Sequence, residues 1–167
     1  TPYLYYGEEI GMVGDKLKTF EDFFGPDAYV REPFLWDVDK KDPLQTAWEK
    51  PAFSTDKTVR PESVQKNDPS SLLNFYRKLI HYRNTSLPLT QGEIEYSGIE
   101  ISEIVSFTRK YKAQEVLVIH NVSDVEITLK LEGDNKKFSD VAYASTDGFI
   151  LSDGELKLPA FSTLILK

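Results

Sequence analysis

The hydrophobic pattern of the chain changes three times, and these changes separate four stretches. The first stretch opens with a short aromatic and apolar run that stops at Gly7. A short apolar run ended by glycine is typical of a buried strand whose two faces are both covered, as in a parallel sheet. Residues 13–67 then show no clear periodicity and carry prolines and charges throughout, yet they are rich in large aromatic residues. We therefore predict that they form an ordered loop and not a disordered linker.

Helical spacing begins after this loop. Asp68 is a favoured N-cap residue, and Pro69 suits the first helical position, where its missing N–H is not needed. Apolar side chains then recur at helical spacing, and cations lie in the later turns, where they suit the helix dipole. The pattern predicts a helix over residues 69–84.

Beyond Pro88 the pattern predicts strands. Short runs rich in β-branched and aromatic residues are separated by turn residues. The predicted strands are Ile94–Tyr96, Ile104–Tyr111, Glu115–His120, Val125–Leu131, Phe138–Ala144 and Ser162–Leu166. Their spacing indicates an antiparallel β-sandwich. We predict two domains, residues 1–90 and residues 91–167, with the sandwich in the second.

Composition and charge disfavour several classes of function. The net charge of −7, with scattered basic residues, disfavours nucleic acid as a partner. No apolar run approaches the roughly 20 residues of a membrane-spanning helix, so we expect no membrane segment in this chain. Without cysteine there is no disulfide or thiolate metal site. The two isolated histidines, His81 and His120, are more typical of packing or surface positions than of a metal site.

Three segments, in this order, resemble the end of the alpha-amylase family of glycoside hydrolases, family 13. Residues 2–12, PYLYYGEEIGM, resemble the eighth strand of the catalytic barrel and the turn that leaves it. Residues 31–37, REPFLWD, are similar to the R-x-P-M-x-W segment of the oligo-1,6-glucosidase and alpha-glucosidase branch, with Phe34 where that branch usually has methionine. Residues 72–84 resemble the last barrel helix, and the strands that follow resemble domain C.

The resemblance implies that residues 1–90 are the last strand, long loop and last helix of a (β/α)8 TIM barrel, followed by a β-sandwich. It also implies a retaining hydrolase that cleaves alpha-glucosidic bonds of starch-like glucans or oligosaccharides, with two carboxylates about 5–5.5 Å apart. In the family, the nucleophile, the acid/base and a stabilising aspartate lie on the fourth, fifth and seventh strands. All three strands precede the eighth. We therefore expect no catalytic residue in this chain and no activity from the chain by itself.

Arg31 is the leading candidate for substrate binding. Its guanidinium offers forked donors that suit paired sugar hydroxyls, or a carboxylate that in turn holds them. The resemblance implies that the matching arginine holds the glucose at the non-reducing end, and the alternative is a structural arginine that pins the loop. Tyr29 and Trp48 offer flat apolar faces to a sugar ring. Aromatic residues in long loops also form the loop's own small core, so this second role stays open.

Several carboxylates invite a chemical role. Glu8 and Glu9 follow the predicted strand, at the end where barrel enzymes place their active sites. Neighbouring side chains in a strand point to opposite faces, which disfavours an acid/base pair and favours a role in shaping the turn. Asp37, Asp39 and Asp42 lack the spacing and the loop glycine of an EF-hand. We expect no metal site and no cofactor in this segment, and calcium in the intact enzyme is left open.

Two other functions are left open. The family includes transporter-associated heavy chains that keep the barrel and lack hydrolase activity, and missing carboxylates and a membrane-anchoring helix upstream would identify that case. The other alternative is a carbohydrate-binding, accessory sandwich. Neither tryptophan lies beyond residue 48, which argues against it.

Overall fold

The computed structural model describes residues 2–14 and 31–167, which divide into two compact units. The first unit runs to His81 and the second from Tyr82 to Lys167. Helix α2 (Leu72–Thr85) contributes residues to both. The predicted division after residue 90 stays a prediction.

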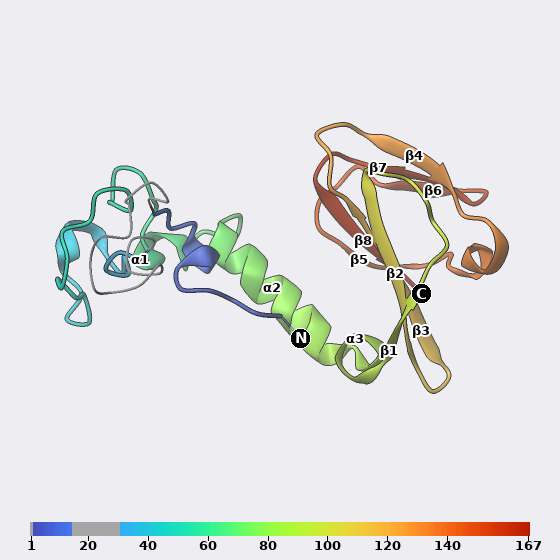
Figure 1. The fold of residues 1–167 in the computed structure, drawn as a ribbon, viewed down its shortest axis with the longest axis horizontal. Helices are drawn as coiled ribbons and strands as arrows, with labels where there is room; N and C mark the ends of the chain where they lie inside the picture. Colours follow the sequence, from blue (N-terminus) through green and yellow to red (C-terminus); the bar gives the residue numbers. More distant parts are fainter. Residues whose placement is uncertain (1, 15–30) are drawn as a thin grey trace, which may run out of the picture. The chain divides into compact units, whose positions relative to one another are not determined.

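Short helices joined by loops make up the first unit (Figure 1). They are η1 (Glu8–Ile10), η3 (Val38–Lys40), α1 (Glu62–Gln65) and most of α2. A small apolar core lies among them. It is formed by Ile10, Phe34, Leu35, Val59 and Leu73, with Met12 and Trp36 packed against it.

The apolar segment before Gly7 is not a strand in this structure. Residues 2–5 have no regular secondary structure. Tyr3 is 91% exposed, and the next three side chains are also exposed. A buried parallel strand needs neighbouring strands to satisfy its backbone groups, and the sheets of the described chain all lie beyond residue 92. The prediction of a buried strand is therefore wrong for the chain as described, while the turn predicted after it is present.

Helix α2 begins at Leu72, later than the sequence predicts. The Asp68 carboxylate accepts hydrogen bonds from the Ser70 N–H and hydroxyl, at 2.9 and 2.7 Å, and so forms a turn before the helix. These bonds, together with the Arg60 guanidinium 2.8 Å away, lower the pKa of Asp68 to about 2. Ser71 caps the helix instead, because its Oγ accepts the Asn74 N–H at 3.2 Å.

The second unit is an antiparallel β-sandwich that follows helix α3 (Leu87–Gln91) (Figure 1). Its larger sheet has the order β1-β2-β3-β8-β5 and its smaller sheet the order β4-β7-β6. The larger sheet comprises β1 (Glu93–Tyr96), β2 (Ile104–Tyr111), β3 (Gln114–Asn121), β8 (Ser162–Leu166) and β5 (Val141–Ala144). The smaller comprises β4 (Ile127–Lys130), β7 (Glu155–Leu158) and β6 (Ile150–Ser152). All the strand pairs are antiparallel, which confirms the predicted sandwich.

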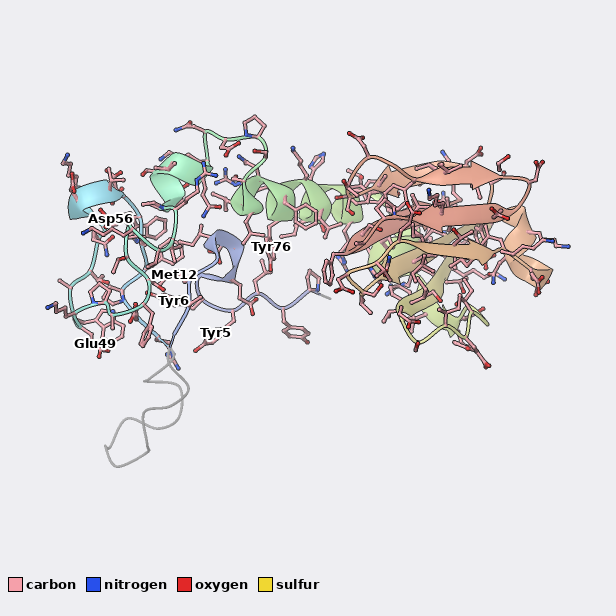
Figure 2. All side chains as sticks on the ribbon, turned by 90° about the horizontal axis from the view of Figure 1, so that it is seen from above. Tyr5, Tyr6, Met12, Glu49, Asp56 and Tyr76 are labelled. Carbon is pink, nitrogen blue, oxygen red and sulfur yellow. The ribbon has the colours of Figure 1, made fainter. Side chains whose placement is uncertain are left out.

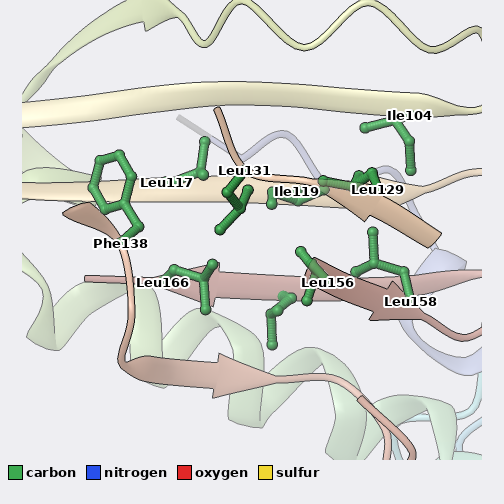
Figure 3. Close-up of a cluster of buried hydrophobic side chains, with 10 residues drawn as sticks. Ile104, Leu117, Ile119, Leu129, Leu131, Phe138, Leu156, Leu158 and Leu166 are labelled. Atoms are coloured by element: carbon green, nitrogen blue, oxygen red, sulfur yellow. The ribbon is translucent and has the colours of Figure 1, made fainter. Parts of the chain in front are cut away.

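Buried leucines dominate the core between the two sheets (Figure 3). Leu117 and Ile119 alternate along β3, are both 0% exposed, and pair with neighbours on β8. Leu156 and Leu158 supply the smaller sheet's side of the same cluster. Burying one such side chain fully contributes about 1.5–3 kcal/mol relative to leaving it exposed. This layer therefore holds the two sheets together.

His120 makes the stability of the sandwich depend on pH. It lies on β3, with its Nδ1 2.8 Å from the Thr163 hydroxyl. Burial lowers the pKa of His120 below its ordinary value of 6.5, because a partly dry site disfavours the charged ring. As the pH falls, the unfolded chain therefore takes up this proton before the folded chain does. The contribution of His120 to stability is full above pH 6.5 and is lost progressively below it.

We expect the wild type to lose more stability than His120→Gln between about pH 8 and about pH 5.5. Urea unfolding of the two proteins at both pH values measures the difference. The carboxylates common to both proteins titrate alike and cancel in the comparison. Equal losses in the two proteins would contradict the prediction.

Candidate functional site

The three segments that resemble the alpha-amylase family meet in the core of the first unit. Ile10 comes from the first segment, Phe34 from the second and Leu73 from the third. The Phe34 ring also lies 5.7 Å from the Tyr6 ring and 4.4 Å from the Trp36 ring, centroid to centroid. Phe34 thus occupies a packed position, which suits a large apolar residue where the related branch has methionine.

A tight turn joins the first segment to this core. Gly7 and Gly11 flank η1 with φ of 83° and 76°, a left-handed conformation that favours glycine. The Glu8 carboxylate accepts the Tyr5 N–H at 3.0 Å, so Glu8 shapes the turn. Glu8 and Glu9 are consecutive residues of η1 and do not end a strand. Figure 2 shows Tyr5, Tyr6 and Met12 on this part of the chain.

A buried glutamine connects the turn to helix α2. Gln65 is 3% exposed, and its side-chain nitrogen donates to the carbonyls of Ile10 and Arg60 at 2.8 and 2.7 Å. Its side-chain oxygen accepts the Leu73 N–H at 3.1 Å. Both N–H donors of the Gln65 side-chain amide and one of the two lone pairs on its oxygen are therefore engaged. Gln65 therefore fixes the turn of the first segment against the third.

Arg31 lies beside the first segment. Its side chain is exposed, and its guanidinium carbon lies 6.0 Å from the centroid of the Tyr5 ring. That distance is the outer limit of a cation–π contact. Trp48 is 57% exposed, so its ring is accessible to a ligand. Tyr29 lies outside the described residues.

Glu32, next to Arg31, is a buried carboxylate at 5% exposure. Its two oxygens accept the backbone N–H groups of three consecutive residues. Oε1 accepts from Ala52 at 2.7 Å and from Phe53 at 3.0 Å, and Oε2 accepts from Phe53 at 3.2 Å and from Ser54 at 2.7 Å. Sequence analysis missed this residue. The only signal was an acidic residue inside an apolar motif, and nothing in the sequence shows which backbone groups it meets.

A cleft of about 390 Å³ lies in the first unit. Its lining residues are Leu35, Asp37, Asp39, Lys50, Pro51, Ser54, Thr55 and Asp56. The lining combines carboxylates, an ammonium group and hydroxyls with two apolar side chains. Such groups can hydrogen-bond the hydroxyls of a polar ligand and leave apolar surface for its carbon atoms.

The acidic residues beside this cleft accept hydrogen bonds from other groups of the chain. Asp37 accepts a hydrogen bond from the Ser63 hydroxyl at 2.6 Å and from the Val38 N–H at 2.8 Å, and these two bonds lower its pKa. Asp42 accepts the Leu44 N–H at 2.7 Å. In residues 2–14 and 31–167, no three histidine or carboxylate side chains are grouped so that they could hold a metal ion.

Within the part of the chain that the structure describes, no helix is both long enough and apolar enough to cross a bilayer.

Comparison with known proteins agrees with the geometry. The family model described as "Alpha amylase, catalytic domain" matches residues 1–92, more than half of the chain. The model described as "Alpha-amylase SusG C-terminal domain" matches residues 104–165. The chain belongs to the alpha-amylase family of glycoside hydrolases.

The individual relatives are longer proteins, which this chain matches only in part. It is 31% identical to alpha-amylase 3 of Dictyoglomus thermophilum over 99% of this chain and 31% of that protein. It is also 31% identical to the amino acid transporter heavy chain SLC3A1 of Mus musculus, over 80% of this chain and 20% of that one. The crystal structure of alpha-amylase from H. orenii superposes with a TM-score of 0.71 at 30% identity, over 99% of this chain and 32% of that one. The chain spans about a third or less of the length of each.

Proposed function

We propose that the protein containing this chain is a retaining glycoside hydrolase that cleaves alpha-glucosidic bonds of starch-like glucans or oligosaccharides. The match of residues 1–92 to the alpha-amylase catalytic domain carries the proposal. Residues 1–90 then supply the end of the barrel, and residues 91–167 form domain C.

The role of this chain in the reaction is to bind substrate and not to perform the chemistry. In retaining glycosidases a nucleophilic carboxylate and an acid/base carboxylate flank the scissile bond. The family resemblance implies that both lie on barrel strands that come before the eighth. We assign substrate binding to Arg31, whose forked donors suit sugar hydroxyls, and stacking against sugar rings to Tyr29 and Trp48. By itself, the chain is proposed to be inactive.

The full polypeptide tests this proposal. It is incubated with soluble starch, a linear maltooligosaccharide and isomaltose, and product anomers are followed by NMR as they form. We expect hydrolysis of at least one substrate with retention of the anomeric configuration, and none from residues 1–167 alone. Absence of hydrolysis in the full polypeptide, together with missing carboxylates upstream, would favour the transporter-associated alternative.

A further inference from the structure

Three stretches far apart in the sequence are held together in the first unit by two polar side chains. Glu32 reaches residues 52–54 through the backbone N–H bonds described above. Ser54, which is 0% exposed, then bonds the backbone of Val13 twice, donating to its carbonyl at 2.7 Å and accepting its N–H at 2.9 Å. Arg31 immediately precedes Glu32 in the chain.

We propose that Glu32 is a positioning residue for substrate binding, which fixes the backbone of Arg31 and the width of the neighbouring cleft. This inference rests on the proposed function. Leu35 and Asp37 line the cleft from the segment that contains Glu32, and Pro51 and Ser54 line it from the segment that Glu32 holds. The separation of these two segments, and so the shape of the cleft, depends on the carboxylate between them.

A carboxylate is required at this position for a specific reason. The two oxygens of Glu32 accept four N–H contacts from three consecutive residues, so both oxygens act as acceptors. A glutamine offers only one acceptor oxygen. Its NH2 group would face N–H donors and leave some of them unsatisfied in a buried place. Glu32→Gln therefore preserves the size and shape of the side chain. It breaks the tether, which is the set of hydrogen bonds from Glu32 to the backbone of residues 52–54.

Loss of the tether is expected to affect binding more than chemistry. Because the chain is proposed to hold substrate and the catalytic carboxylates lie elsewhere, a shifted cleft weakens ground state and transition state alike. Such a loss raises KM and leaves kcat almost unchanged. A role confined to stability would lower the amount of folded enzyme and would leave KM unaltered.

The test compares variants of the full polypeptide with a soluble maltooligosaccharide as substrate. For Glu32→Gln we expect KM to rise about tenfold with kcat changed less than about twofold. Glu32→Asp keeps both oxygens on a shorter side chain, and we expect an intermediate KM. If Glu32→Gln does not fold, the Glu32→Asp variant still provides the test. Amide exchange at residues 52–54 is measured in parallel, and faster exchange in both variants reports the broken tether directly.

Asn74→Ala is the matched control. The Asn74 side chain donates to the carbonyls of Gln65, Lys66 and Asp68, so it also holds three backbone groups of the same unit. We expect it to lower stability and leave KM unchanged. An active wild type with an unchanged KM in both Glu32 variants would overturn the inference, as would unchanged exchange at residues 52–54. An inactive wild type would instead overturn the proposed function, and the exchange data would still decide whether the tether exists.

Discussion

Replacing Arg31 with alanine in the full polypeptide is expected to lower kcat/KM for an oligosaccharide by tens-fold or more. Hydrogen bonds from a charged group contribute about 1.5–3 kcal/mol each, and about 1.4 kcal/mol corresponds to a factor of ten. The loss of one well-formed pair of hydrogen bonds from the guanidinium therefore accounts for the expected effect. Steady-state kinetics with a maltooligosaccharide measure it. The exposure of Arg31 and its position beside Tyr5 are consistent with access to a ligand.

Two variants separate binding from a general effect of removing an arginine. Arg31→Lys keeps the charge and loses the planar fork, so it is expected to recover only part of the activity. Arg77→Ala removes another arginine of the same unit, whose Nη2 lies 3.6 Å from Glu62. The Arg77 side chain is 54% exposed, ion pairs at the protein surface contribute about 0–1 kcal/mol, and we expect the kinetics of this variant to match the wild type. Wild-type kinetics in Arg31→Ala would remove Arg31 from the substrate site and leave it a structural residue.

The strands of the sandwich are predicted closely from the sequence because each strand's apolar pattern lies within a short stretch of the chain. β2 and β8 have the bounds that the apolar alternation predicts. The hairpin of β6 and β7 was missed because β6 has only three residues. The stretch predicted as a strand from Phe138 becomes a strand only at Val141. It follows the short 3-10 helix η4 (Gly133–Lys137).

The first unit is less predictable because its key contacts join residues distant in sequence. Glu32 meets the backbone 20 to 22 positions away, and Ser54 meets Val13 at a separation of 41. Neither partner follows from composition or periodicity. The helix start was placed too early because two residues three positions apart, Asp68 and Ser71, can both cap a helix, and only the structure shows which one does. The family motifs identify the three segments that meet in the core of the first unit, whereas the bonds that hold these segments together appear only in the structure.

In a polypeptide consisting only of residues 1–167, we expect amides of β3 to exchange about a thousandfold or more slowly than those of Leu4–Tyr6. Core amides exchange through openings that approach the global free energy of unfolding, whereas exposed backbone opens at almost no cost. β3 is paired on both sides, with β2 and β8. The three residues Leu4–Tyr6 are 42–49% exposed and belong to no strand. Hydrogen exchange read by mass spectrometry or NMR measures both regions in one sample.

Leu117→Ala tests whether that protection comes from the core between the sheets. A cavity at a fully buried leucine costs about 2–5 kcal/mol, and Leu117 is 0% exposed. Exchange should therefore quicken across β3 by more than tenfold, while Leu4–Tyr6 stays as fast as before. Strong protection at Leu4–Tyr6 in the isolated polypeptide would contradict the prediction, because it would mean that this segment finds strand partners within residues 1–167. In the full polypeptide the same segment is expected to become protected, because the neighbouring barrel strands that the family resemblance implies would then satisfy its backbone groups.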